Sequence, residues 1–136
     1  MFKTISIQTK GHYDFIDITA QVATVVKENN TREGLAIIFV SGSTAAITTM
    51  EYEEGLIQDL KEVFEDLAPE AKNYHHHQRW GDHNGAAHIK AALVGQDLTV
   101  PIENGQLQLG TWQQIVLIDF DERPRERKLI IKMVRD

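Results

Sequence analysis

The sequence predicts an α+β fold, a compact single domain with mixed or antiparallel β-sheets and about three helices. Apolar or alternating segments of strand length recur along the chain, and the run GLAIIFV at 34–40 is the clearest. A later segment, EEGLIQDLKEVFEDLAPE, repeats its apolar residues at helical spacing, so they share one face. The pair Asn104-Gly105 lies between two strand-like segments and favours a type I′ hairpin turn.

The N-terminal third is expected to contain three strands and one helix. Residues 2–8 and 11–18 have the composition of two strands joined by a turn. Thr19 is expected to cap a helix over AQVATVVKEN, in which three valines form an apolar stripe. The continuous apolar run at 34–40 is typical of an interior strand covered on both faces.

The remaining chain is expected to alternate between helices and strands. TAAITTM forms a strand before the amphipathic helix, and Pro69 ends that helix. Asn84 is expected to cap a short helix, GAAHIKAALV, which Gly95 terminates. LTVPIENGQLQL forms the hairpin, and IVLIDF and KLIIKMV form two last strands around the charged turn DERPRER.

Length and composition restrict the class of protein. The 136 residues fit one domain, 1–136, that is long enough to bury a core. A formal charge of −6 argues against a general nucleic-acid binder, and the absence of cysteine excludes disulfides and thiolate ligands. MFKTISIQTKG lacks the apolar core of a signal peptide, and no apolar run is long enough for a bilayer. A cytoplasmic protein without membrane or nucleic-acid partners is therefore expected.

Five of the six histidines lie within YHHHQRWGDHNGAAHIK, at 74–90. Imidazole binds metals and carries protons near neutral pH. His88 is expected in the first turn of its helix, beside small residues that leave room for a ligand. His76 can reach the same site from the preceding loop, and Asp82 can add an oxygen ligand or orient a ring. Three such ligands with an open position form a catalytic zinc site, whereas the alternative is a polar loop of solvated histidines.

The histidine triplet is expected to divide its side chains between two faces. In an extended segment His75 and His77 point away from the face that carries His76. At most one side of the triplet is then expected to serve the site.

Other polar groups are further candidates. Glu51, Glu53 and Glu54 include a candidate metal ligand or base, whereas a solvated helix start is the simpler explanation for any one of them. Arginine forks in the final turn suit phosphate, but a mixed-charge turn is usually a wet surface. Gln113, beside Trp112 in TWQQ, can point into a pocket, whereas buried tryptophans usually belong to a core.

An ordered series of motifs resembles the YjbQ family, small proteins sometimes labelled secondary thiamine-phosphate synthases. The resemblance covers nearly the whole chain and is most specific in its C-terminal half. The N-terminal half adds Thr44-Ala45-Ala46-Ile47-Thr48 and Glu51. The C-terminal series is Tyr74-x-His76, Asn84-Gly85, Ala87-His88-Ile89-Lys90, Leu93-x-Gly95, Thr99-Val100-Pro101-Ile102, Gly105, Leu109-Gly110-Thr111-Trp112-Gln113 and Asp121-x-Arg123-Pro124-Arg125.

The resemblance implies a YjbQ-like α+β fold assembled as a homotrimer, with a site near a subunit boundary. It implies that His76, His88 and Glu51 belong to this site, while His75, His77 and His83 fall outside the motifs. Two departures are clear. Many members have a histidine where this chain has Gly42, and Asp121-Glu122-Arg123 replaces a common acidic-Asp-Gly series.

Three functions are compatible with these residues. The resemblance implies a transferase that joins hydroxymethylpyrimidine diphosphate to a thiazole phosphate, releasing pyrophosphate. In this reaction Arg125 and Lys90 bind phosphate, and Glu51 or Asp82 holds Mg²⁺. His76, His88, Glu51 and Gln113 are the catalytic candidates. A zinc-type hydrolase acting on a small phosphorylated substrate, with His76, His88 and Asp82 as ligands, is the second interpretation. A non-enzymatic trimer that binds a small anion is the third.

Overall fold

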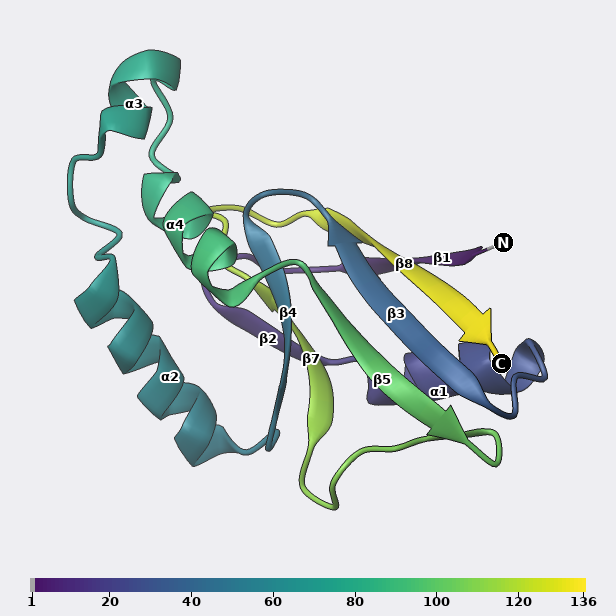
Figure 1. Cartoon of the computed structure of the whole chain (residues 1–136). Helices are drawn as coiled ribbons and strands as arrows, with labels where there is room; N and C mark the ends of the chain where they lie inside the picture. The colour runs from purple at the N-terminus through teal and green to yellow at the C-terminus, as the bar shows by residue number, and fades with distance from the viewer. Residues whose placement is uncertain (1) are drawn as a thin grey trace.

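A computed structural model describes residues 2–136, apart from the side chain of Trp80. It has the predicted α+β architecture, with antiparallel sheets and four helices where about three were expected (Figure 1). The strands are β1 (Phe2–Gln8), β2 (Asp14–Asp17), β3 (Gly34–Ser41), β4 (Ala45–Met50), β5 (Asp97–Glu103), β6 (Gln106–Leu107), β7 (Gln114–Asp119) and β8 (Glu126–Arg135). The helices are α1 (Thr19–Glu28), α2 (Glu54–Leu67), α3 (His75–Trp80) and α4 (Gly85–Val94).

The strands form two antiparallel sheets. The five-stranded sheet has the order β1-β8-β3-β5-β6, and the three-stranded sheet has the order β2-β7-β4. The hairpin between β5 and β6 turns at Asn104 and Gly105, whose φ angles of 54° and 77° are those of the predicted type I′ turn. Figure 1 shows α2 and α4 on the side of β4 and β2, away from β3 and β8.

One apolar core lies between the two sheets. It joins Ile38 of β3 and Ile131 of β8 to Ile115 and Leu117 of β7. Helix α1 adds the predicted stripe of Val22, Val25 and Val26. Burial of such side chains contributes about 1.5–3 kcal/mol each, so this core supplies much of the driving force for folding.

A second core fills the space between the three-stranded sheet and the helices. Val116 and Ile118 project from β7 to this face, because successive side chains of a strand alternate. They pack with Phe64 of α2 and with Ala87 and Ala91 of α4. Strand β7 is therefore buried on both faces, and the small alanines allow α4 to approach the sheet closely.

The expectation that β3 is covered on both faces is wrong for its outer face. Leu35 and Phe39 are 39% and 41% exposed, while Ala36, Ile38 and Val40 between them are buried. Leu35 is paired with Val134 of β8, and Phe39 with Ile130. A continuous apolar run thus forms a strand with one apolar face toward solvent.

Two local expectations are wrong: the capping residue of α1 and the extended conformation of the histidine triplet. Ile18, rather than Thr19, occupies the N-cap position of α1. The Thr19 hydroxyl instead accepts a hydrogen bond from the Ile115 backbone at 2.8 Å, which ties α1 to β7. Residues 75–80 form helix α3, so the histidine triplet is not extended and its side chains do not alternate between two faces.

The charged segment after β7 is largely a buried network and not the wet surface expected of a mixed-charge turn. Asp119 and Asp121 are fully buried, and Arg127 is nearly so. The Arg127 guanidinium donates to both oxygens of Asp119, at 2.8 and 3.0 Å, and to the Thr44 hydroxyl at 2.6 Å. These bonds join β7 of one sheet to β8 of the other and to Thr44, just before β4.

Among the described residues, no helix has the length and apolar content that crossing a bilayer requires. The longest described helix, α2, has 14 residues.

We predict that Arg127→Ala lowers the free energy of unfolding by about 3–5 kcal/mol, because it leaves the Asp119 charge buried without its partner. Lys128→Ala is the matched control, since Lys128 is the next residue of β8 and is exposed, and it should cost less than about 0.5 kcal/mol. Urea unfolding of both variants measures the difference. Equal losses in the two variants would contradict a structural role for the ion pair.

Candidate functional site

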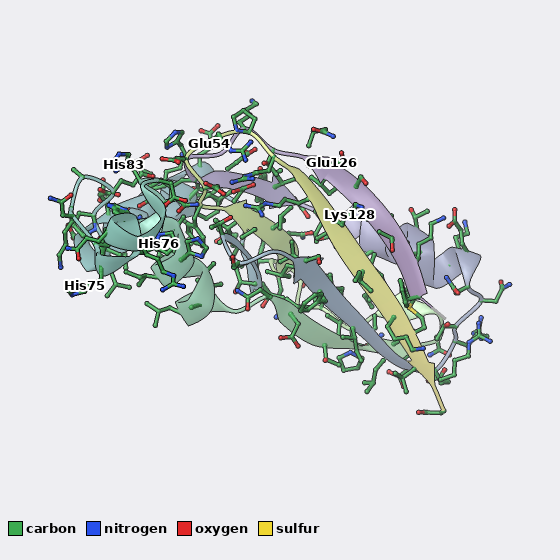
Figure 2. All side chains as sticks on the ribbon, turned by 90° about the horizontal axis from the view of Figure 1, so that it is seen from above. Glu54, His75, His76, His83, Glu126 and Lys128 are labelled. Carbon is green, nitrogen blue, oxygen red and sulfur yellow. The ribbon has the colours of Figure 1, made fainter. Side chains whose placement is uncertain are left out.

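The imidazoles of His76 and His88 come together from two different helices. Their ring centroids are 4.5 Å apart, and the ring planes are inclined by 42°. His76 lies on α3 and not on a loop, and His88 lies in the first turn of α4, as expected. Figure 2 shows His75, His76 and His83 gathered at one end of the molecule, away from Glu126 and Lys128 on β8. The structure therefore brings together the two histidines on which the predicted site depends.

His77 attaches α3 to the start of α4. The Gly85 backbone N–H donates to His77 Nε2 at 3.1 Å, so a neutral His77 carries its proton on Nδ1. A Cβ at Gly85 would lie 2.9 Å from Tyr74 Cβ and 3.0 Å from His77 Nε2. The glycine is therefore needed for close approach, and His77 has a structural role that its place outside the family motifs did not reveal.

Asp82 lies beside His76 on the segment between the two helices. Its Oδ1 is 3.4 Å from His76 Nδ1, and neither atom has a hydrogen-bond partner among the described residues. Protonation of His76 would turn this contact into an ion pair. Asp82 therefore lies beside His76 without a hydrogen bond to it, and its expected role as an oxygen ligand or as an acceptor that orients the ring stays a prediction.

Asp121 forms the buried base of the site. Its carboxylate accepts hydrogen bonds from the Thr44 hydroxyl at 2.8 Å, the Asn84 amide at 3.4 Å and the Glu122 backbone at 2.7 Å. Arg125 donates to the same carboxylate from Nε at 3.0 Å and approaches it from Nη2 at 2.8 Å. Burial raises the pKa of Asp121, but the hydrogen bonds and the guanidinium outweigh burial and bring this pKa below its ordinary value.

His88 is held in its neutral form. Burial lowers the pKa of His88, and the neighbouring His76 lowers this pKa further. Asp121 and Asp82 act in the opposite direction, and Arg125 adds a lowering effect. A neutral imidazole has one N–H donor and one acceptor nitrogen, so near pH 7 His88 can accept a proton on one nitrogen and donate a hydrogen bond from the other.

The half-exposed Arg125 gives this group an anion-binding element. Its guanidinium is fixed by Asp121 and acts electrostatically on His88. A fixed arginine whose charge acts on His88 can, together with the imidazole N–H groups, donate hydrogen bonds to phosphate oxygens. The arrangement therefore suits a small phosphorylated ligand.

Two predicted site residues lie at the other end of β4. Thr44, just before this strand, contacts Asp121, whereas the exposed Glu51 follows the strand's last residue. Gln113 lies near Glu51, because its amide donates to Thr49 at 3.0 Å, and it lines a separate cavity of about 310 Å³. Six residues of strand span about 20 Å, so one chain does not bring Glu51 and Gln113 to His88.

Lys90 is directed away from the predicted phosphate site. Its side chain is 1% exposed, and its ammonium donates to the Tyr13 hydroxyl and lies 3.6 Å from Glu65. Burial lowers the pKa of Lys90, and the Glu65 charge partly offsets this effect. The described contacts place Lys90 in a structural cluster between α4 and α2 and do not include Arg125.

A metal site is less well formed than the histidine cluster suggested. In the part of the chain that the structure describes, no three histidine, aspartate or glutamate side chains are arranged to hold one ion. The predicted set of His76, His88 and Asp82 provides a histidine pair with one adjacent carboxylate.

Gly42, where the resemblance led us to expect a histidine, adopts a φ of 143° that favours glycine. A Cβ there would lie 2.8 Å from Arg127 Nη1. A histidine at this position would require the end of Arg127 to move. Glycine at position 42 therefore leaves room for the guanidinium in the buried Asp119–Arg127 pair.

Sequence reasoning did not identify Thr44, Asn84 and Asp121 as partners within the site. The available signal was the spacing of the charged residues. Asp119, Asp121 and the arginines that follow them recur at every second position. A period of two residues directs alternate charged side chains inward when the segment is extended.

We predict that His88 titrates below the ordinary value of 6.5, and nuclear magnetic resonance of its ring protons measures this pKa. The unfolded chain then takes up this proton at higher pH than the folded protein does. The contribution of His88 to the free energy of unfolding is therefore present above about pH 6.5 and is lost as the pH falls toward the folded pKa. His88→Gln should reduce that loss, and an unchanged pH dependence would contradict the assignment.

Comparison with known proteins identifies relatives over almost the whole chain. Residues 3–136 match the family described as "UPF0047 protein YjbQ-like". A UPF0047 protein of Archaeoglobus fulgidus is 40% identical over 128 residues, which cover 94% of this chain and 97% of that protein. The UPF0047 protein YugU of Bacillus subtilis is 36% identical over 135 residues, with coverages of 98% and 99%.

Solved structures agree with this relationship. A YbjQ-like protein of unknown function from Sulfolobus solfataricus superposes with a TM-score of 0.93 at 31% identity, covering 100% of this chain and 97% of that one. An uncharacterized conserved protein from Clostridium acetobutylicum gives a TM-score of 0.89 at 36% identity, with coverages of 97% and 99%. The chain belongs to the YjbQ-like UPF0047 family.

Proposed function

We propose that the group formed by His76, His88 and Arg125 binds a small phosphorylated substrate and catalyses a thiamine-phosphate synthase-type transfer. The observation that carries this proposal is the 4.5 Å approach of the two imidazoles beside an arginine fixed by a buried carboxylate. The choice of reaction follows the label that the resemblance implied, and the residues of this group supply the hydrogen-bond donors and the positive charge that such a transfer requires.

In this reaction the bond between the pyrimidine methylene carbon and the diphosphate oxygen breaks. The thiazole nitrogen donates its electron pair to that carbon, and pyrophosphate leaves with the electrons of the broken bond. Arg125 neutralises charge on the departing diphosphate, and the N–H groups of His76 and His88 donate to its oxygens. His76, stabilised by Asp82 at 3.4 Å, is the better placed of the two to supply a proton to the leaving group.

We also propose that the protein is a homotrimer and that Glu51 and Gln113 act beside the histidines of another copy. Two observations support this assembly. Glu51 and Gln113 lie at the opposite end of β4 from Asp121, so a site containing all predicted residues requires a second chain. The outer face of the five-stranded sheet carries exposed apolar side chains, including Leu35, Phe39 and Val134, which another copy can cover.

We predict that His88→Ala lowers the rate of thiamine phosphate formation by about 10²–10³-fold, as expected for loss of a positioned hydrogen-bond donor to the leaving diphosphate. The assay uses hydroxymethylpyrimidine diphosphate, thiazole phosphate and Mg²⁺, with untagged protein. His75→Ala is the control, because His75 is an exposed histidine of α3 outside the proposed group, and its loss should leave the rate unchanged.

The outcomes of this assay separate the three functions. An equal rate in both variants removes His88 from the mechanism. Zinc found by elemental analysis of untagged protein, lost in His88→Ala, would favour the hydrolase. Saturable phosphate binding without turnover of the two precursors would favour an anion-binding protein.

We predict that light scattering gives a mass in solution of three times the chain's 15.4 kDa. Phe39→Asp should dissociate the trimer, because it places a charge on the proposed apolar interface. Val63→Asp is the control, since Val63 is an exposed apolar residue of α2. A monomeric parent protein, or dissociation by both variants alike, would overturn the proposed interface.

A further inference from the structure

Helix α2 carries two adjoining rows of apolar side chains, and the protein covers only one of them. Ile57 and Phe64 form the inner row and pack in the second core. The outer row advances by four, three and four residues and consists of Leu56, Leu60, Val63 and Leu67. This is the heptad spacing of a seam that receives a second helix.

The outer row is open to solvent. Val63 and Leu67 are 58% and 59% exposed, and Leu56 is partly exposed. Leu60 reaches the second core with part of its side chain. Helix α1, by contrast, buries all three valines of its stripe. Figure 1 shows α2 at the periphery of the molecule, where another helix can approach it.

Contacts on the other sides of α2 fix the direction of the outer row. Phe64 packs edge-on against Phe120, with ring centroids 5.0 Å apart. Glu65 points to the side opposite the outer row, where it accepts from the Tyr13 hydroxyl at 2.6 Å and lies 3.6 Å from Lys90 of α4. The exposed row is therefore held in place before binding, which reduces the entropy that a partner must offset.

Acidic side chains border the outer row. Asp59, Glu62 and Asp66 are exposed, and Asp59 and Asp66 occupy the positions that flank a heptad seam. Helix α2 has five acidic residues and one lysine. Antiparallel pairing of two copies of α2 would place these aspartates opposite each other, and such like-charge contacts are unfavourable. A second copy is therefore a poor occupant of this surface.

No described helix of this chain supplies the complementary charge. Each of the four helices in residues 2–136 has a single lysine or arginine. A helix that matches both the apolar row and its acidic border must then come from another protein.

We propose that the outer row of α2 docks a basic amphipathic helix of a partner protein. Apolar side chains of the partner, at the same spacing, pack between Leu56, Val63 and Leu67, and its lysines or arginines pair with Asp59 and Asp66. The 14 residues of α2 extend over about 21 Å, so the contact spans about four helical turns. The proposal depends neither on the proposed reaction nor on the trimer, whose interface was assigned to the five-stranded sheet.

The test titrates the full-length protein with a designed helical peptide of about 15 residues, which has leucines at the seam positions and lysines beside them. A second peptide has glutamates in place of the lysines, and a third has serines in place of the leucines. Nuclear magnetic resonance follows the backbone amides of α2. We expect saturable shifts with the first peptide only. Absence of saturable shifts with the first peptide, or equal shifts with either of the others, would overturn the proposal.

Variants separate the apolar row from its charged border. Val63→Ser combined with Leu67→Ser should weaken binding of the lysine peptide by about tenfold or more, because it removes the two most exposed apolar contacts. Asp59→Asn combined with Asp66→Asn should weaken it by about threefold and reduce its salt dependence. Leu93→Ser is the control, since Leu93 is 64% exposed on α4, which lies on the Glu65 side of α2. Unchanged affinity in the Val63, Leu67 double variant would contradict the assignment.

Two other occupants have distinct outcomes. A solution mass that Val63→Asp lowers would identify a second copy on this surface. Flotation of the protein with phosphatidylcholine vesicles, lost in Val63→Asp, would identify a lipid surface. Either result would overturn the choice of a basic helix.

Discussion

The buried carboxylate of Asp121 is the interaction on which the candidate site depends. It accepts hydrogen bonds from Thr44 before β4, from Asn84 at the start of α4 and from Arg125 after β7. A carboxylate without solvent is stable only when paired and hydrogen-bonded, so these three segments are fixed relative to one another. Neighbouring Asp119 binds Arg127 in the same way, and together the two aspartates join both sheets to α4.

The position of α4 then determines what the histidines can do. Alanines on one side of the helix let it lie against the three-stranded sheet, and Gly85 lets Tyr74 and His77 approach its first turn. His76 is thereby held beside His88, and partial burial keeps His88 neutral. The resulting pair combines hydrogen-bond donors with a neutral imidazole, whereas an exposed histidine would take up its proton at a higher pH than His88 does.

Several features of the fold followed from local patterns. Amphipathic spacing located α1 and α2, Asn84 and Gly95 marked the ends of α4, and Asn104-Gly105 marked the hairpin. Helix α3 was missed because HHHQRW has no apolar periodicity and depends on contacts with α4. The exposed face of β3 was missed because a continuous apolar run does not indicate which face of the strand another element covers.

The sequence by itself determined the α+β class and the family motifs, located most of the helices and strands, and named His76 and His88 as candidates. These are properties of neighbouring residues, and local backbone preferences act over the same short range. Only the tertiary structure decided that Lys90 is buried against Tyr13, that Asp121 holds Arg125, and that Glu51 and Gln113 lie at the far end of β4. These relations join residues far apart in the chain, and they are fixed by which elements pack together.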